Sequence, residues 1–175
     1  RRRLMEGYLG TIFRFVFLVI LQGLVLNNVD LFGFVSSYLY ILVILLFPLE
    51  ANKSMVLFLS FLLGMSVDMF SHTWGMHTSA SVFTAFMRPG LLTVLAPRDG
   101  YPLGTRPDMS HMGINWFLAY SFLLIFFHHI FLFFVEAFRF SEFFYTLGRS
   151  IASMLFTFAL VIVSQFLTFR EKRVL

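Results

Sequence analysis

Ionisable and hydroxyl side chains gather in one stretch of an otherwise apolar chain, from Asp68 to Arg88. The carboxylate of Asp68 and the imidazoles of His72 and His77 are of the types that serve as general acids and bases or as metal ligands. Long apolar runs flank the stretch, and ionisable groups in such a setting need polar partners or a wet cavity. The residue types therefore point to a polar site enclosed by hydrophobic helices.

Helical spacing places these side chains on common faces. Asp68 and His72 are four residues apart, so on a helix they share one face and can form a charge pair. The next apolar run carries polar residues at an i, i+4, i+7, i+11 spacing, namely His77, Ser81, Thr84 and Arg88. Because lipid offers no hydrogen bonds, we expect this face to point into a helix bundle. It is then either an outward-opening pocket or partner-docking seam, or an internal hydrogen-bond network that fixes helix packing.

Other polar residues inside apolar runs have structural interpretations. Arg88 is expected to pair with a backbone carbonyl or a lipid phosphate on the inner side, and Arg14 has the same two options. His128 and His129 point about 100 degrees apart on a helix, so we expect one to meet the interior and the other to approach the outer interface. The last run carries a stripe of hydroxyl residues: Ser150, Ser153, Thr157 and Ser164. This stripe is a helix–helix contact surface or, equally, a groove for a partner's helix.

Catalytic and metal-binding signatures are missing from the sequence. Asp68, His72 and His77 have acceptable ligand types, but they lack HExxH spacing and a second acidic residue, so we expect no metal. Cysteine is absent, which excludes thiolate sites and disulfides. A GxxxxGK[ST] loop, a GxSxG motif, paired carboxylates and a basic–aromatic nucleic-acid surface are also missing. We expect a non-enzymatic protein with no cofactor and no nucleic-acid partner.

Composition indicates a polytopic membrane protein. Of the 175 residues, 59% are hydrophobic and 13% are charged, against about 25% charged residues in an average soluble domain. Phenylalanine alone contributes 26 residues, and runs of roughly 20 apolar residues cross a bilayer as helices. The sequence therefore predicts one all-α membrane domain over residues 1–175. It has six transmembrane helices, at about 8–26, 34–49, 55–70, 74–95, 116–135 and 151–169, of which the second is short.

The basic residues predict the orientation of these spans. Six spans place both termini on one side, and with that side in the cytoplasm Arg139 and Arg149 lie outside, while Arg14 and Arg88 fall within runs. The other nine of the 13 Lys and Arg residues are then cytoplasmic: Arg1, Arg2, Arg3, Lys53, Arg98, Arg106, Arg170, Lys172 and Arg173. The positive-inside rule thus predicts cytoplasmic termini and puts the turn from Asp68 to His77 on the outer face.

Several segments, in this order and at this spacing, carry a family resemblance. In the first half they are Leu21-Gln22, Leu26-Asn27-Asn28, Leu31-Phe32-Gly33, Tyr38-Leu39-Tyr40 and Leu46-Phe47-Pro48-Leu49. They continue with Gly64-x-x-x-Asp68-x-Phe70, Gly75-Met76-His77, Ala85-Phe86-Met87-Arg88-Pro89, Gly104-Thr105-Arg106-Pro107, His128-His129 and Glu136-Ala137-Phe138. Together they cover nearly the whole chain. The chain resembles the MreD family of rod shape-determining proteins and looks most like its Bacteroidota members.

The resemblance implies a small bacterial inner-membrane protein of the cell-elongation machinery, the rod complex, which helps to maintain cell shape and regulate peptidoglycan synthesis. It implies binding to the transmembrane helix of MreC and, through MreC, to RodA and a class B penicillin-binding protein, with MreB and RodZ nearby. The family is also similar to the substrate-binding subunits of energy-coupling-factor transporters, whose pocket opens outward. An alternative function is therefore a transporter subunit that binds a small molecule or lipid. The polar stretch from Asp68 to Arg88 would hold the interior together or line the pocket.

Overall fold

The computed structural model describes residues 2–28, 33–137 and 142–168 of the chain, and every regular element in these ranges is helical. The order is α1 (Arg2–Leu24), the 3-10 helix η1 (Leu26–Asn28), α2 (Ile41–Leu45), α3 (Lys53–Ser71), α4 (Met76–Val94), α5 (Met109–Met112), α6 (Ile114–Ala137) and α7 (Phe143–Thr168). Several residues used above lie outside the described residues: Arg1, Leu31, Phe32, Phe138, Arg139, Phe169 at the end of the sixth predicted span, Arg170, Lys172 and Arg173.

Among the described residues, four stretches of helix are long and apolar enough to cross a membrane, which suggests a membrane protein. They are Gly10–Asn28, Lys53–Ser71, Ile114–Ala137 and Phe143–Thr168. Their outward faces carry large apolar side chains such as Phe13, Phe144 and Leu167, which are 74%, 85% and 83% exposed. Apolar surface of this extent marks contact with a membrane or with other proteins. Helix α4, with 19 residues, is as long as α3 but carries the predicted polar stripe.

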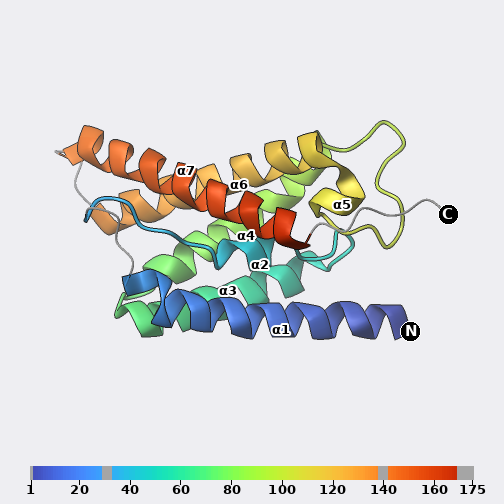
Figure 1. The fold of residues 1–175 in the computed structure, drawn as a ribbon, viewed down its shortest axis with the longest axis horizontal. Coiled ribbons are helices and arrows are strands. Elements are labelled where there is room, and N and C mark those ends of the chain that lie inside the picture. The colour runs from blue at the N-terminus through green and yellow to red at the C-terminus, as the bar shows by residue number, and fades with distance from the viewer. Residues whose placement is uncertain (1, 29–32, 138–141, 169–175) are drawn as a thin grey trace.

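The second predicted span, 34–49, is not a continuous helix, and the prediction of six spanning helices is wrong at this segment. Only the five residues of α2 are helical, so this helix is about 7.5 Å long at 1.5 Å per residue, against a hydrocarbon core of about 30 Å. Residues 36–38 belong to no helix or strand; Figure 1 draws this part of the chain as a stretched-out trace leading to α2, and we call it the extended arm. The chain after α2 is irregular as far as Asn52. We call residues 34–52 the interrupted segment. Figure 1 shows it running through the bundle with α2 near its middle.

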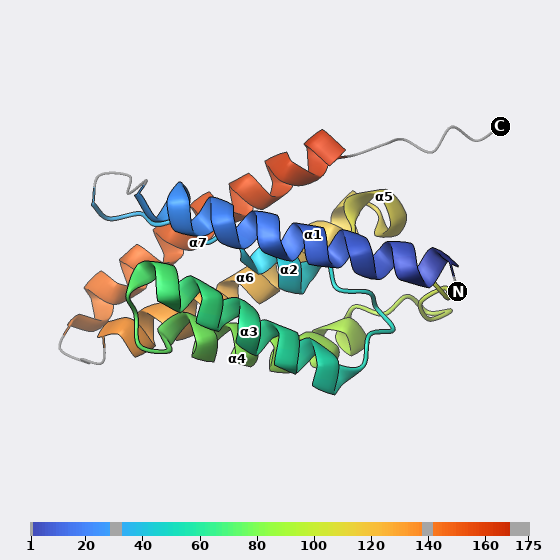
Figure 2. The same cartoon turned by 90° about the horizontal axis from the view of Figure 1, so that it is seen from below.

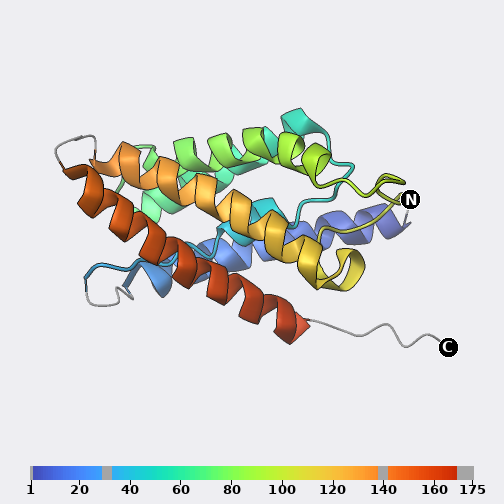
Figure 3. The ribbon, with the colours of Figure 1, turned by 90° about the horizontal axis from the view of Figure 1, so that it is seen from above.

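The long helices run back and forth along one axis, so their connections collect at two ends (Figures 1 and 3). The start of α1, the start of α3, α5 and the end of α7 lie at one end, which we call the terminal end. The turn between α3 and α4 and the start of α7 lie at the opposite end, which we call the hairpin end. Between them, α2 contacts α1, α4 and α6. Polar residues near the α3–α4 turn are thus far from the start of α1 and the end of α7.

Helices α3 and α4 form a tight antiparallel hairpin. Asn52 caps α3, because its side chain accepts a hydrogen bond from Ser54 N–H at 2.9 Å. The turn uses left-handed backbone at His72 and Gly75, with φ of 54° and 82°. A Cβ at Gly64 would lie 2.4 Å from a backbone atom of α4, so only glycine lets the two helices approach this closely.

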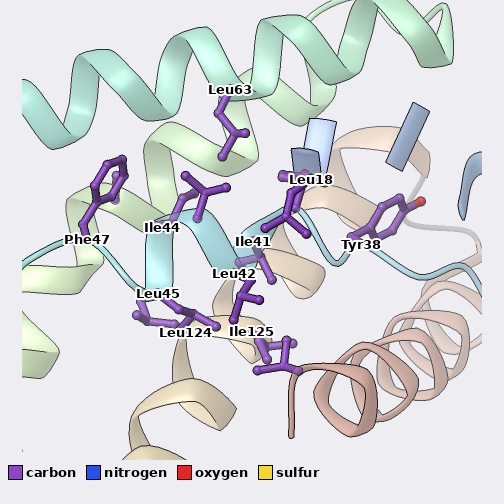
Figure 4. Close-up of a cluster of buried hydrophobic side chains, with 14 of the residues drawn as sticks. Leu18, Tyr38, Ile41, Leu42, Ile44, Leu45, Phe47, Leu63, Leu124 and Ile125 are labelled. Atoms are coloured by element: carbon purple, nitrogen blue, oxygen red, sulfur yellow. The ribbon is translucent and has the colours of Figure 1, made fainter. Parts of the chain in front are cut away.

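The apolar core surrounds α2. All five of its residues are buried, and Figure 4 shows the side chains that cover them from α1, α3 and α6: Leu18, Leu63, Leu124 and Ile125. Non-helical backbone at membrane depth is tolerated only where protein or water surrounds it. The core meets this condition at α2, because all five of its residues are covered by the surrounding helices.

Candidate functional site

Hydroxyl groups of α7 bind the extended arm of the interrupted segment. Ser153 accepts a hydrogen bond from Ser36 N–H at 3.1 Å, and Thr157 accepts one from Tyr38 N–H at 3.1 Å. Ser150 is fully buried on the same face of α7. Backbone groups outside a helix need such partners, because unpaired backbone groups in a bilayer cost several kcal/mol each. The stripe of α7 is therefore an internal contact surface from Ser150 to Thr157.

Helix α1 binds the same arm from the other side. The side chain of Gln22 is fully buried and donates to the carbonyl of Ser37 at 2.8 Å. It also donates to Asn27 at 2.9 Å, and Asn27 donates to the hydroxyl of Ser71 at 2.8 Å. This chain of side chains joins α1, the interrupted segment and the end of α3. The arm is thus fixed from two sides before α2 begins.

Arg88 holds the opposite end of the interrupted segment. Its guanidinium donates to the carbonyl of Phe47 at 2.5 Å and to the hydroxyl of Tyr120 at 2.8 Å. Tyr120 in turn donates to the carbonyl of Leu45 at 3.0 Å. Arg88 is 3% exposed, and the carbonyls it binds follow the short helix, whose last carbonyls have no partners of their own. A positive charge at this position also matches the helix dipole. Of the two partners expected for Arg88, the structure gives the backbone carbonyl.

Tyr40 connects two buried histidines at the start of α2. Its hydroxyl lies 3.1 Å from Nδ1 of His77 and 2.7 Å from Nε2 of His128. A phenol has one proton to donate, so it donates to one imidazole and accepts from the other. Within the described part of the chain, Nδ1 of His128 has no partner. The three side chains bring α4, the interrupted segment and α6 to one point.

His129 and Thr157 form a second buried pair, between α6 and α7. Nδ1 of His129 lies 2.9 Å from the carbonyl of Ile125, so it must carry the proton. Nε2 is then the acceptor, and the hydroxyl of Thr157 donates to it across 3.0 Å. A hydroxyl beside an imidazole base is the geometry of an activated nucleophile. Here both side chains are fully buried and the hydroxyl already accepts from Tyr38, so the pair fixes helix positions.

Asp68 caps α4 from the neighbouring helix. Its carboxylate accepts hydrogen bonds from the backbone N–H groups of His77 and Thr78 at 3.0 and 2.9 Å. The hydroxyls of Thr73 and Thr78 donate to it at 2.5 and 2.6 Å. These N–H groups belong to the first turn of α4, where no carbonyl of the same helix is available and negative charge is favourable. The carboxylate is 6% exposed, and its hydrogen bonds close the α3–α4 turn.

A polar cavity opens at the hairpin end. It has a volume of about 310 Å³ and is lined by η1, the extended arm, the α3–α4 turn and the facing ends of α6 and α7. Its polar lining includes Asn27, Ser37, His77, Glu136 and Arg149. The last two form an ion pair at 3.0 Å. Among the described residues, no three His, Asp or Glu side chains lie close enough together to hold a metal ion.

The structure brings together most, but not all, of the predicted polar interior. Asp68 and the stripe of α4, formed by His77, Ser81, Thr84 and Arg88, are buried. The prediction for His72 is wrong, because this residue is exposed and ends α3 in the left-handed conformation. The described partners of the Asp68 carboxylate are Thr73, His77 and Thr78 instead. On α7, Ser164 is half-buried and donates to its own helix at Val161, so it lies apart from the contact surface.

The expectation for the two adjacent histidines is also wrong. His128 and His129 are both fully buried, with ring centroids 5.2 Å apart. Helix α6 packs against α4 on one side and α7 on the other, so two directions about 100 degrees apart both point inward. Helix spacing alone does not show that a helix has neighbours on both sides.

Sequence reasoning missed the residues that complete these contacts. Gln22, Tyr40 and Tyr120 are fully buried and bind the interrupted segment or the histidines. The available signal was a polar group inside an apolar run, since an amide or phenol at that depth needs a partner. Comparison with known protein families, with curated proteins and with solved structures finds no match for this chain.

Proposed function

We propose that this chain is a non-enzymatic scaffold of the bacterial cell-elongation complex, an MreD-type protein that binds the transmembrane helix of MreC. Through MreC it would act on RodA and a class B penicillin-binding protein, with MreB and RodZ as further neighbours. It would lie in the inner membrane as a multi-pass protein with both termini in the cytoplasm. In this role it supports cell shape and the regulation of peptidoglycan synthesis without chemistry of its own.

One observation supports the proposal above others: the scattered segments that carry the family resemblance meet in space. Gln22 binds the residues around Tyr38, and Tyr40 lies between His77 and His128. Arg88 binds Phe47. The segments that carry the resemblance are far apart in the sequence, yet they meet around the interrupted segment. Such buried networks fix helix positions, which is what a scaffold needs.

The partner helix needs a face on the outside of the bundle, and α3 and α4 provide one. An open apolar groove runs between them, lined by Leu57, Phe61, Gly75, Thr78, Ser79, Val82, Phe83 and Phe86. Small side chains lie between exposed phenylalanines, and small residues let a second helix approach closely. The hydroxyl stripe of α7 is occupied by the interrupted segment, so it is not available for this role. We therefore assign the MreC helix to the α3–α4 groove.

Co-purification with MreC tests the assignment. Ser79→Phe fills the groove without removing an interhelical hydrogen bond, because Ser79 donates only to Met76 of its own helix. Ser66→Phe is the matched control, since Ser66 is also half-buried, bonds its own helix at Leu62 and lies outside the groove. We expect Ser79→Phe to lose MreC and Ser66→Phe to retain it. Equal recovery in both variants would remove the groove from the proposal.

A second test concerns the interior. Asp68→Ala and Arg88→Ala remove the groups that close the α3–α4 turn and the end of α2. We expect both variants to give less folded protein and less MreC complex. A stable complex recovered in full from either variant would show that the scaffold does not depend on that residue.

The cavity at the hairpin end favours a second candidate function, capture of a small polar molecule on the outer side. Its volume of about 310 Å³ lies at the lower end of the ~300–1,000 Å³ of small-molecule sites. Its lining mixes donors, acceptors and an ion pair. Native mass spectrometry of the purified chain separates the two functions. A retained small molecule that Arg149→Gln releases favours capture, and a stoichiometric MreC helix without such a molecule favours the scaffold.

A further inference from the structure

A second, larger cavity lies between α1 and α7, away from the polar contacts described above. It has a volume of about 690 Å³, within the ~300–1,000 Å³ of ligand sites. Figure 2 shows α1 and α7 diverging toward the terminal end, with α5 between them. The interrupted segment also lines it, through Leu39, Leu42, Leu46 and Pro48. We call this cavity the α1–α7 groove.

The α1–α7 groove has one apolar wall and a charged end with two cations and one carboxylate. Phe17, Leu18 and Leu21 of α1 face the leucines of the interrupted segment across it. Phe17 is 53% exposed, so the groove is open to the surroundings of the bundle. Arg14 and Arg106 line its end beside α5, where Asp108 also lines it, and the α7 side is polar, with Ser164, Gln165 and Thr168. This combination matches a molecule with an anionic head and a hydrocarbon tail.

The two guanidinium groups are available for such a head. Neither forms a hydrogen bond or an ion pair with another described residue, although Arg14 lies within electrostatic range of Arg106 and Asp108. One oxygen of the nearby Asp108 carboxylate, Oδ1, accepts from the backbone N–H of His111 at 2.9 Å and from the His111 ring at 2.7 Å, so this acid is drawn toward His111. Two cations that face one cavity repel each other, and an anion between them removes this repulsion.

The depth of Arg14 fits the same ligand. Arg14 lies in the N-terminal part of the apolar stretch Gly10–Asn28, about 6 Å along the helix from Gly10 at 1.5 Å per residue. Long cationic side chains at this depth reach the headgroup layer. A phosphate accepts paired hydrogen bonds from guanidinium groups, and basic pockets between transmembrane helices are known sites for lipid headgroups.

We propose that the α1–α7 groove binds an anionic glycerophospholipid, with its phosphate between Arg14 and Arg106 and one acyl chain along the leucines of the interrupted segment. This site does not depend on the scaffold function, because it shares no residue with the groove assigned to MreC. Bound lipid would fill the space between α1 and α7 and so stabilise the end of the bundle where the helices diverge.

Native mass spectrometry of the full chain tests the site with phosphatidylglycerol and phosphatidylcholine of the same acyl chains. We expect phosphatidylglycerol to be retained preferentially. Loss of one Arg–phosphate interaction should weaken its binding about tenfold, or ~1.4 kcal/mol, in Arg14→Gln and in Arg106→Gln. Arg98→Gln is the matched control. Arg98 is exposed and lies, like Arg106, in the connection between α4 and α5, but it does not line the groove. It should bind as the wild type does.

A variant without charge change tests the position of the acyl chain. Ser164 is half-buried and lines the groove, so Ser164→Phe should reduce retention of both lipids, while Ser66→Phe should not. Each of the following results would overturn the proposal: equal retention of the two lipids by the wild type, an Arg98→Gln loss as large as that of Arg106→Gln, or unchanged lipid retention in Ser164→Phe. A cross-linked protein helix in the groove in place of lipid would also overturn it.

Discussion

At the scale of single residues, the polar side chains of the bundle act on backbone groups more than on each other. Asp68 binds the first turn of α4, Arg88 the carbonyl of Phe47, and Ser153 and Thr157 the N–H groups of the extended arm. Each hydrogen bond to a charged group contributes about 1.5–3 kcal/mol, and leaving a buried partner unpaired costs about as much. These residues are therefore tested by stability rather than by activity.

Asp68 provides the first such test. Asp68→Ala removes every hydrogen bond that the carboxylate makes to the α3–α4 turn, so we expect a loss of about 1–3 kcal/mol in unfolding free energy. Asp68→Asn keeps one acceptor oxygen and should lose less. His72→Ala changes an exposed side chain and should stay within about 0.5 kcal/mol of the wild type. Denaturant unfolding in detergent measures all three variants, and an equal loss for His72→Ala would contradict the capping role.

Arg88 tests whether shape or charge is needed at the end of α2. Its planar guanidinium reaches Phe47 and Tyr120 at the same time, which a lysine ammonium cannot reproduce. We expect Arg88→Lys to lower the unfolding free energy by about 1.5–3 kcal/mol, although the charge is retained. Thermal unfolding measures the effect, and Arg98→Lys, at an exposed position, serves as the control. A wild-type transition for Arg88→Lys would show that charge alone is sufficient.

At the scale of elements, the α3–α4 hairpin depends on one glycine. Gly64→Ala would place a Cβ 2.4 Å from the Cα of Thr78, so the helices must separate or the variant must unfold. A clash with backbone cannot be relieved by a side-chain rotation, and we expect a loss of about 1–3 kcal/mol. Gly90→Ala in α4 meets no atom within 4 Å and should gain about 0.5–1 kcal/mol from helix propensity. Opposite signs in paired unfolding curves would establish the contact.

Apolar periodicity predicts the long elements well. The predicted run 55–70 corresponds to α3 at Lys53–Ser71, and 74–95 to α4 at Met76–Val94. Polar spacing also identified the inward face of α4, because hydroxyl groups find no hydrogen-bond partner in lipid and therefore face the interior of the bundle. The interrupted segment was not predictable in this way. Its apolar composition is the same whether it forms a helix or an extended arm, and the partners that decide between them are residues of α7 more than 100 positions away.

At the scale of the whole molecule, the two ends differ in chemistry. The hairpin end carries the cavity with Glu136 and Arg149, and the terminal end carries the α1–α7 groove with Arg14 and Arg106. The positive-inside rule predicts that the terminal end faces the cytoplasm. A small outer cavity and a cationic inner groove would then lie on opposite sides of the membrane.

Single-cysteine labelling checks this orientation, because the chain contains no cysteine of its own. Trp74 in the α3–α4 turn is 96% exposed, and Leu103 in the connection between α4 and α5 is 93% exposed. In spheroplasts, we expect a membrane-impermeant maleimide to label Trp74→Cys directly and Leu103→Cys only after the membrane is permeabilised. The reverse pattern would place both termini outside, and with them the α1–α7 groove.

The interrupted segment also constrains how the protein is made. Ser36 and Tyr38 find their hydroxyl partners 117 and 119 residues later in the chain. Until α7 has been made, residues 36–38 lack these two hydroxyl partners. We therefore expect the interrupted segment to reach its final position only after α7 is in place. A nascent chain halted before Ser150 should keep residues 36–38 open to water-soluble reagents, and release of the finished chain should close them off.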